Sequence, residues 1–380
     1  MKIVHVIAGL TDGGAEGVLY RLCLQDQLNT HTVLSLTDGG KYGPLLQTDG
    51  IALHCLNMPR GRLTWAGVVR LYRLIRDLRP DVVQTWMYHA DFIGGLIAKI
   101  AGVRRVYWGV RNSLMTVKES GWVIFFLARI NAFLSRWIPV GVICCADRAK
   151  DMHQNIGYAA NKLITIPNGY NLDSFKPDSK IGSQLRVALA IDESIPLLGC
   201  VSRYSPQKNH EGLLKALSLV KKNGIAFRCL LVGRGLDTDN TQLVSWLIQY
   251  GLQDEILLLG QRKDVPAIMN ALDLHVLPST AEGFPNVIAE AMACETPCVS
   301  TDVGDAAYII GQTGWLVPPA DAQLLAEAIQ SALVCWNDKT AWSLRRTAAR
   351  TRIMEHFSLE KMVATYRATW ENGLQDVSSV

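Results

Sequence analysis

The chain has 380 residues, of which 49% are hydrophobic and 19% are charged, and its formal net charge is +4 at pH 7. This composition excludes a disordered chain, and the length predicts two domains because single cores usually stop growing at about 250–300 residues. The charge is uneven, since residues 1–180 contain 21 Lys and Arg against 13 Asp and Glu, while the remainder contains 17 against 21. A basic first half suits a phosphate-bearing substrate or an anionic membrane surface, although solvated arginines are the plainer interpretation.

The cysteines and the apolar segments indicate which kinds of structure are not expected in this chain. The nine cysteines are odd in number, and they predict neither a disulfide framework nor a zinc site, so we expect a cytoplasmic protein. The short apolar run Met1–Ile7 predicts a core strand rather than a signal peptide. Arg129 and Arg136 interrupt the long apolar stretch from Trp122 to Cys145, so no membrane-spanning helix is expected there.

Short β-branched segments alternate with amphipathic helical segments along the chain, which is typical of parallel sheets built from βαβ units. The strands expected in the first half are Lys2–Ile7, Thr32–Leu36, Ala52–Leu56, Asp81–Thr85, Arg105–Trp108, Val140–Cys144 and Leu163–Ile166. Those expected in the second half are Leu197–Val201, Arg228–Val232, Ile256–Leu259, Leu274–Leu277, Pro297–Ser300 and Gly314–Val317. The helices expected between them include Ala15–Gln27, Thr64–Leu78, Asn209–Lys222, Asn286–Ala293 and Asp321–Ala332.

The fold class is therefore α/β, with two Rossmann-like, doubly wound parallel-sheet domains that face a central cleft. Turn and linker residues from Pro167 to Lys180 place the boundary between residues 1–178 and 179–358. Ligands bind at the carboxyl ends of the strands in such sheets, so the segments that follow strands carry most of the functional information.

The most informative segment follows the strand Leu274–Leu277. Glu282 lies in a loop before a helix, and Glu290 lies within that helix beside Val287 and two alanines. The free N–H groups at the start of this helix make a site for phosphate or sugar oxygens, and an acid on an apolar helix face needs a partner such as ribose hydroxyls. A solvated helical glutamate is the plainer alternative. The predicted binding segment comprises Gly283, Phe284, Pro285, Asn286 and Val287.

A second segment follows the strand Leu197–Val201. Arg203 and Lys208 lie near the start of the next helix, where a guanidinium and an ammonium suit a diphosphate whose charge grows as it leaves a sugar. Arg234, in a Gly-Arg-Gly turn after Arg228–Val232, either shapes the nucleotide pocket or belongs to an ordinary turn. An ordinary basic loop is the alternative for Arg203 and Lys208.

With these motifs in order, the whole chain resembles the retaining glycosyltransferases of family 4, which have the GT-B fold. The resemblance rests on Glu282 and Glu290 as a Glu-x7-Glu motif, Arg203 and Lys208 as an Arg-x4-Lys pair, Gly13-Gly14, and Pro167-Asn168-Gly169. It implies that Glu290 binds the donor ribose and that Glu282 with the following backbone holds the sugar and diphosphate. It also implies that Arg203 and Lys208 stabilise the leaving nucleoside diphosphate, and that Gly14 lets the first domain approach it. In relatives the last helix crosses back onto the first domain, which we expect of residues 359–380.

Two residues of the first half are further catalytic candidates. Many relatives carry a histidine after the strand matched by Arg105–Trp108, whereas this chain has Arg111, which could contact donor phosphate or acceptor. His89, after Asp81–Thr85, is a candidate to line the acceptor side, and a buried, satisfied histidine is the equal alternative.

Two other ligand motifs are discounted. The loop from Gly9 to Gly14 lacks the Gly-x-Gly-x-x-Gly spacing of dinucleotide folds, so a nicotinamide cofactor is not expected. Asp237-Thr238-Asp239 resembles a metal motif of another glycosyltransferase class, but here it follows a turn and is expected to cap the helix from Thr241. No cofactor and no metal site are expected.

The predicted enzyme is a retaining, metal-independent hexosyltransferase that moves a sugar from a UDP- or GDP-sugar to an acceptor hydroxyl in surface polysaccharide or glycolipid biosynthesis. The acceptor is a saccharide or a lipid-linked saccharide, peripheral contact with the inner face of the plasma membrane is expected from the aromatic helix Trp122–Trp137, and no nucleic acid is involved. The alternatives are a nucleotide-sugar epimerase or phosphorylase on the same fold, or a saccharide- or nucleotide-binding protein without turnover. A glycosidase is less favoured because its two carboxylates must face one glycosidic bond.

Overall fold

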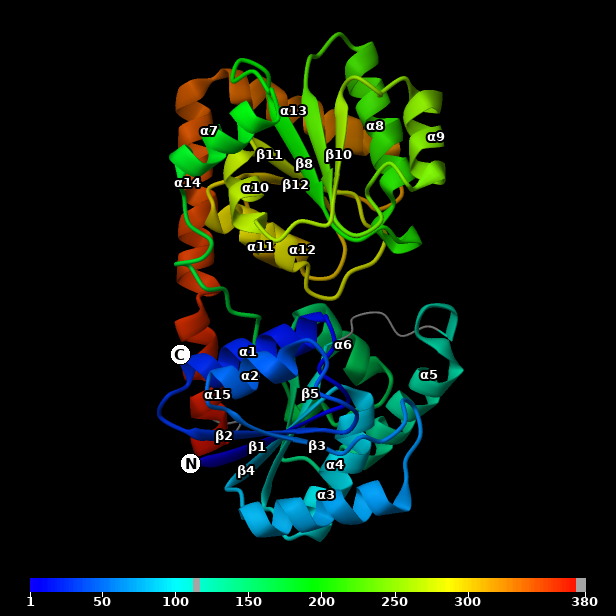
Figure 1. The fold of residues 1–380 in the computed structure, drawn as a ribbon, viewed down its shortest axis with the longest axis vertical. Helices are drawn as coiled ribbons and strands as arrows, with labels where there is room; N and C mark the ends of the chain where they lie inside the picture. Colours follow the sequence, from blue (N-terminus) through cyan, green and yellow to red (C-terminus); the bar gives the residue numbers. More distant parts are fainter. Residues whose placement is uncertain (112–116, 374–380) are drawn as a thin grey trace. The chain divides into compact units, whose positions relative to one another are not determined.

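The computed structural model describes residues 1–111 and 117–373 (Figure 1). The chain forms two compact units, which we call the first unit and the second unit. The first unit contains Met1–Gly169 and the chain from Leu359 onward, and the second unit contains Tyr170–Ser358. The chain therefore leaves the first unit after residue 169 and returns to it after residue 358.

The first unit is built on a seven-stranded parallel sheet of order β3-β2-β1-β4-β5-β6-β7. Its strands are β1 (Lys2–Ile7), β2 (Thr30–Ser35), β3 (Ala52–Cys55), β4 (Val82–Trp86), β5 (Arg105–Val110), β6 (Gly141–Cys144) and β7 (Leu163–Thr165). Its helices are α1 (Gly14–Gln25), α2 (Tyr42–Thr48), α3 (Trp65–Leu78), α4 (Tyr88–Ile100), α5 (Val117–Leu134), α6 (Asp147–Asn155) and α15 (Leu359–Asn372). The central strands are buried nearly throughout, as is usual for parallel strands covered on both faces.

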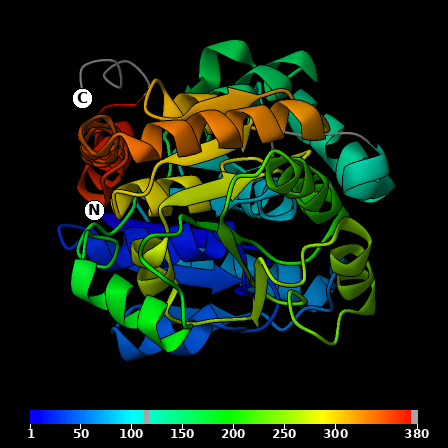
Figure 2. The same ribbon diagram turned by 90° about the horizontal axis from the view of Figure 1, so that it is seen from above.

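The second unit is built on a six-stranded parallel sheet of order β10-β9-β8-β11-β12-β13. Its strands are β8 (Leu197–Val201), β9 (Arg228–Val232), β10 (Ile256–Gly260), β11 (Leu274–Leu277), β12 (Cys298–Thr301) and β13 (Trp315–Val317). Its helices, which cover both faces of the sheet (Figure 2), are α7 (Ser179–Ala188), α8 (His210–Lys222), α9 (Thr241–Tyr250), α10 (Val265–Ala271), α11 (Asn286–Ala293), α12 (Ala306–Ile310), α13 (Ala322–Asn337) and α14 (Lys339–His356). The expectation of two doubly wound α/β domains is confirmed.

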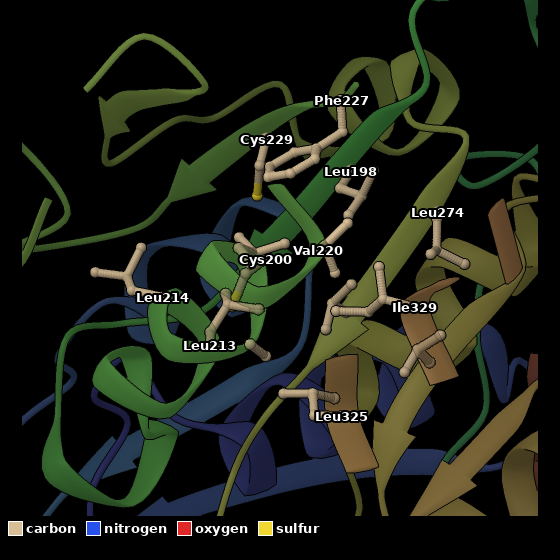
Figure 3. Packing of buried hydrophobic residues seen from close by; sticks show 14 of the residues in the cluster. Leu198, Cys200, Leu213, Leu214, Val220, Phe227, Cys229, Leu274, Leu325 and Ile329 are labelled. Carbon is tan, nitrogen blue, oxygen red and sulfur yellow. The ribbon is translucent and has the colours of Figure 1, made fainter. Parts of the chain in front are cut away.

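One face of the second sheet packs on α8 and α13. Leu198 and Leu274 from neighbouring strands meet Leu213 of α8 and Ile329 of α13 in a single buried cluster (Figure 3). These side chains are completely buried. Their packing fixes the two strands whose carboxyl ends carry the predicted motifs.

Helix α15 completes the first unit, where it packs against α1 (Figure 1). Tyr366 and Trp370 of this helix are fully buried in the same cluster as Ile3 and Trp86. Arg367 on the same helix forms an ion pair of 2.6 Å with the buried carboxylate of Asp26. The core of the first unit is thus made from both ends of the chain.

Helix α5 carries large apolar side chains on its solvent side. The helical backbone is broken at Gly121, where φ is 78°. After this break, Trp122, Phe126 and Phe133 are 66%, 58% and 60% exposed, respectively. Of the helices in the described ranges, none combines the length and the apolar character that crossing a bilayer would require.

One local expectation was wrong in detail. Helix α9 is capped by Asn240, whose side chain accepts from the N–H of Leu243, rather than by Asp237 or Asp239. Pro285 is the N-cap of α11, one residue before the helix begins.

Candidate functional site

The strand order of the second unit reverses between β8 and β11, which are neighbours in the sheet. Loops that leave two such strands diverge to opposite sides of the sheet, and the crevice between them is the usual ligand site of a doubly wound fold. The loop after β8 contains Arg203 and Lys208, and the loop after β11 contains Glu282. The sequence-predicted residues therefore surround the point where a ligand is expected.

The structure brings Lys208 and Glu282 into direct contact. The Nζ atom of Lys208 lies 2.5 Å from Oε1 of Glu282, and the two side chains are only 15% and 11% exposed. The hydroxyl of Ser279 donates to the same oxygen at 2.6 Å. Removing one partner of a largely buried ion pair leaves the other charge uncompensated and destabilises the protein. Each side chain of this Lys208–Glu282 pair therefore depends on the other.

Hydrogen bonds join the two loops. The N–H of Thr280 donates to the carbonyl of Gln207 at 2.8 Å, and the side-chain amide of Asn209 donates to the carbonyl of Pro278 at 3.1 Å. Asn209 also caps α8 through the N–H of Gly212. Behind them, burial lowers the pKa of His210 to about 4, so its ring is neutral at pH 7 and hydrogen-bonds to Ser202. The site is therefore held by fixed contacts between the two loops.

Helix α11 presents Glu290 on its accessible face. The helix starts at Asn286 without a side-chain cap, and the start of a helix is a favourable place for a phosphate oxygen. Asn286, Val287 and Glu290 are partly exposed, whereas Ile288, Ala289 and the remaining residues of the helix are buried. Spacings of three and four residues place these three on one side, which aligns the carboxylate with the start of the helix.

Phe284 contributes its backbone rather than its ring to this crevice. Its ring is 8% exposed, stacks on the ring of Tyr170 and makes an edge-on contact with the ring of Phe357 in the second unit. The neighbouring carbonyl of Gly283 accepts from the N–H of Asp305. A Cβ at Gly304, where φ is 53°, would lie 2.1 Å from that carbonyl oxygen, so only glycine fits there.

Arg203 and Arg234 are exposed, and neither guanidinium forms a hydrogen bond or an ion pair within the described parts of the chain. Their loops are tied together, because the N–H of Tyr204 donates to the carbonyl of Arg234 at 2.9 Å. A Cβ at Gly233 would lie only 1.9 Å from the carbonyl oxygen of Ser202. The Gly-Arg-Gly turn thus lets the β9 loop lie directly against the β8 loop, with both arginines available to a ligand.

In the first unit, the predicted glycines lie where expected. Gly13 is the N-cap of α1, and the helix begins at Gly14 with no side-chain cap. A Cβ at Gly13 would lie 2.3 Å from a carboxylate oxygen of Glu16 in the first turn of the same helix. Glu16 accepts a hydrogen bond from the hydroxyl of Thr11 at 3.1 Å, and this carboxylate already stands at the positive end of the helix.

Arg111 is engaged by other residues of the first unit. Its guanidinium donates to Asn168 and to the hydroxyl of Tyr366, both at 2.5 Å, and lies 4.9 Å from the centre of the Trp86 ring. These contacts connect the end of β5 to the Pro-Asn-Gly segment and to α15. A catalytic contact of Arg111 stays a prediction, and its visible role is to hold three segments together.

His89 lies in the first turn of α4, is partly exposed, and lines a cavity of the first unit. Burial lowers its pKa, which favours a neutral ring at pH 7. The nearby Asp91 was not singled out from sequence. It is completely buried, and burial raises its pKa to about 8. Hydrogen bonds from Thr85 and Gly109 act in the opposite direction and lower the pKa, but their effect is smaller. A carboxylate two residues after a candidate histidine, in the helix that follows a strand, was the available signal.

One cluster in the described ranges resembles a metal site by composition alone. The potential ligand atoms of His5, Cys23 and His31 lie within 4.8 Å of one another. The ring of His5 accepts from Trp86 Nε1 at 3.1 Å and lies 2.9 Å from His31, whose other nitrogen faces Asp26. Both rings are therefore used in hydrogen bonds, and burial raises the pKa of the Cys23 thiol, which disfavours a thiolate ligand. We assign this cluster to the core of the first unit.

Each half of the chain matches a known protein family. Residues 12–174 match the family described as Glycosyltransferase Family 4, and residues 195–334 match the family described as Glycosyl transferases group 1.

Individual relatives extend over most of the chain. A UDP-Gal:alpha-D-GlcNAc-diphosphoundecaprenol alpha-1,3-galactosyltransferase of Escherichia coli is 26% identical over 310 residues, which are 78% of this chain and 76% of that protein. The capsular polysaccharide biosynthesis glycosyltransferase CapM of Staphylococcus aureus is 25% identical over 344 residues, covering 85% and 87%. Among solved structures, Anabaena Alr3699/HepE in complex with UDP has a TM-score of 0.86 at 23% identity, covering 98% of this chain and 100% of that one. This structural similarity concerns the fold.

Proposed function

The chain belongs to the family 4 glycosyltransferases of the GT-B type, and we propose that it moves a hexose-type sugar from a UDP- or GDP-sugar to an acceptor hydroxyl with retention at the anomeric carbon. The observation that carries this proposal is the Lys208–Glu282 pair at the strand-order reversal of the second unit. A cation and an acid held there, beside an uncapped helix start, fit the diphosphate and the sugar of one donor.

In this proposal, Glu290 accepts hydrogen bonds from the donor ribose, and Lys208 and Arg203 bind the diphosphate. Glu282 fixes the position of Lys208, and its carboxylate also accepts hydrogen bonds from hydroxyl groups of the sugar. Gly13 and Gly14 allow backbone N–H groups of the first unit to contact the donor, and Arg234 adds charge near the nucleotide.

The reaction breaks the bond between the anomeric carbon and the phosphate oxygen and forms a bond from that carbon to the acceptor oxygen. The acceptor proton passes to the departing diphosphate on the same face of the sugar, so the protein supplies positioning and stabilisation of negative charge. Lys208 and Arg203 supply the positive charge in this scheme, so no divalent cation is required. Activity in the presence of EDTA is the direct check.

We further propose a saccharide or lipid-linked saccharide acceptor of surface polysaccharide or glycolipid synthesis, reached at the inner face of the plasma membrane. Two relatives support this by name, one acting on a diphosphoundecaprenol-linked sugar and the other in capsular polysaccharide biosynthesis. The exposed Trp122, Phe126 and Phe133 on α5 and the basic first half provide the corresponding surface.

The test begins with a thermal-shift screen of UDP, GDP and their sugars, followed by an assay for release of free nucleoside diphosphate. Release that depends on an acceptor, with a product of retained configuration, supports the proposal. Release with phosphate alone indicates a phosphorylase, a changed sugar without an acceptor indicates an epimerase, and binding without turnover indicates a binding protein.

Two variants assign the site. Glu290→Gln is expected to weaken donor binding, and Glu282→Gln to lower the transfer rate by about 10-fold or more, because each loses a charge-assisted hydrogen bond. Glu327→Gln, at an exposed position of α13, is the matched control. An unchanged transfer rate in Glu282→Gln would remove Glu282 from the site.

A further inference from the structure

The first unit contains a cavity of about 750 Å³ whose lining is mostly apolar, which we call the apolar cavity. It lies where the strand order of the first sheet reverses, between β1 and β4. Ala8 and Gly9 directly follow β1, and His89 and Phe92 belong to the helix that follows β4. Its size is in the range of small-molecule sites, and its position is the usual ligand position of a doubly wound sheet.

The walls of the apolar cavity suit a hydrocarbon. Leu36 and Met58 form buried parts of the lining, and Phe92 and Leu127 are partly buried. Besides two arginines, the polar side chains of the lining are Thr11, Glu16, Thr37 and His89, and the other lining residues are glycines or apolar. An apolar chain gains free energy when it leaves water for such apolar walls. The walls therefore select an apolar ligand.

One side of the cavity is positively charged. Arg60 and Arg62 lie on the turn that precedes α3 and line the cavity together with Leu63. Both arginines are exposed, and within the described ranges neither guanidinium pairs with an acid. Two guanidinium groups two residues apart are complementary to a diphosphate.

The cavity opens beside the exposed face of α5. Trp122, Val123 and Phe126 line it and are 66%, 70% and 58% exposed. The same exposed face continues beyond the cavity through Phe133, which is 60% exposed. The exposed apolar face of α5 is therefore continuous with the lining of the cavity.

We propose that the apolar cavity binds the hydrocarbon of an isoprenoid-diphosphate-linked acceptor, with the diphosphate bound by Arg60 and Arg62. The inference rests on the lipid-linked acceptor of the proposed function and names its binding site. The cavity and its arginines belong entirely to the first unit, whereas the Lys208–Glu282 pair belongs to the second unit.

Titration of the full chain with farnesyl diphosphate tests this, with inorganic diphosphate and farnesol as comparison ligands and binding followed by calorimetry and by the fluorescence of Trp122 against a Trp122→Phe blank. Farnesyl diphosphate is expected to bind at least about 10-fold more tightly than either comparison ligand, because only it contacts both the walls and the arginines. Equal affinity for farnesyl diphosphate and inorganic diphosphate overturns the proposal.

Paired variants locate the binding. Leu127→Asp on the cavity wall and the double variant Arg60→Ala/Arg62→Ala are each expected to weaken farnesyl diphosphate binding by about 10-fold or more. Phe133→Ser, exposed on the same helix but outside the cavity, and Arg73→Ala/Arg76→Ala, exposed on α3, are the matched controls and should change affinity by less than about 2-fold. Weakening by Phe133→Ser as large as that by Leu127→Asp would indicate only a general apolar surface and would overturn the cavity assignment.

Donor binding, measured on the same preparations, separates the two proposals. Retained nucleotide-sugar binding without farnesyl diphosphate binding rejects the cavity assignment and leaves the proposed function standing. Farnesyl diphosphate binding without any nucleotide-sugar binding supports the cavity and rejects the proposed donor chemistry. The exposed arginine variant is expected to fold even if Leu127→Asp does not, so one informative variant remains.

Discussion

The two units place different residues at equivalent points of the same strand order. Where the order reverses in the second unit, the loops after β8 and β11 join a lysine and a glutamate in a largely buried pair. Where it reverses in the first unit, the loop after β1 carries glycines, the helix after β4 carries a histidine, and the apolar cavity lies beside them. The shared topology sets where a ligand binds, and the residues after the strands determine which ligand it is.

The units also differ in how their cores are closed. The second unit is a continuous segment, Tyr170–Ser358, whereas the first needs α15 from the end of the chain. The largest effect on stability is therefore expected from Trp370→Ala. This indole is fully buried, and its loss should lower the stability of the first unit by about 3–5 kcal/mol.

Scanning calorimetry in the presence and absence of UDP tests this difference between the units. The Trp370→Ala change should lower the transition of the first unit and leave the UDP-sensitive transition of the second unit in place. The matched control is Trp336→Ala on α13, a partly buried indole of the second unit, which should affect the second transition. Equal shifts of both transitions by Trp370→Ala would show that the two cores are not independent.

Lys208→Ala should give the next largest effect, on catalysis. Loss of this cation removes charge stabilisation of the leaving diphosphate and removes the ion pair that holds Glu282, so kcat/KM should fall by about 10²–10³-fold. Lys221→Ala is the control, because Lys221 forms a more exposed ion pair with Glu255. Comparable losses in the two variants, measured by nucleoside diphosphate release, would mean that the Lys208–Glu282 pair is structural.

The smallest effect is expected from Asp91→Asn in the first unit. The pKa of Asp91 rises from 3.8 to about 8 on folding because the carboxyl group is buried. The folded state therefore holds a proton that the unfolded state has lost, and the stability of the wild type decreases as the pH rises from about 4 to about 8. Asparagine removes this dependence, so the variant should gain about 2 kcal/mol relative to the wild type between about pH 6 and about pH 7.5.

Urea unfolding at both pH values measures the gain. Asp77→Asn, at an exposed position of α3, is the control and should show no such change. If the difference in unfolding free energy between the variant and the wild type is the same at both pH values, Asp91 is not protonated in the folded protein.

Much of the fold could be predicted from the sequence because strands buried on both faces leave continuous apolar segments. The expected strand Leu274–Leu277 coincides with β11, and Lys2–Ile7 coincides with β1. The ends of elements were less certain. The expected aspartate cap of α9 was wrong because a neighbouring asparagine, Asn240, reaches the free N–H group instead.

Contacts across long sequence separations could not be predicted from local pattern. Lys208 and Glu282 are 74 residues apart, and Arg111 and Tyr366 are 255 residues apart. The motifs identified which residues matter, but the partner of each side chain depends on which loops the sheet order brings together. Asp91 was missed for a related reason, since its protonation depends on burial that no single segment encodes.

Because α15 belongs to the first unit, the order of translation affects the order in which the cores of the two units can be completed. Domains generally fold as units during synthesis, starting from the N-terminus. Here Tyr366 and Trp370, which fill the core around β1 and β4, are made only after the whole second unit has been translated. The second unit is thus translated after β1 and β4, yet its core can be completed before the core of the first unit, which needs α15.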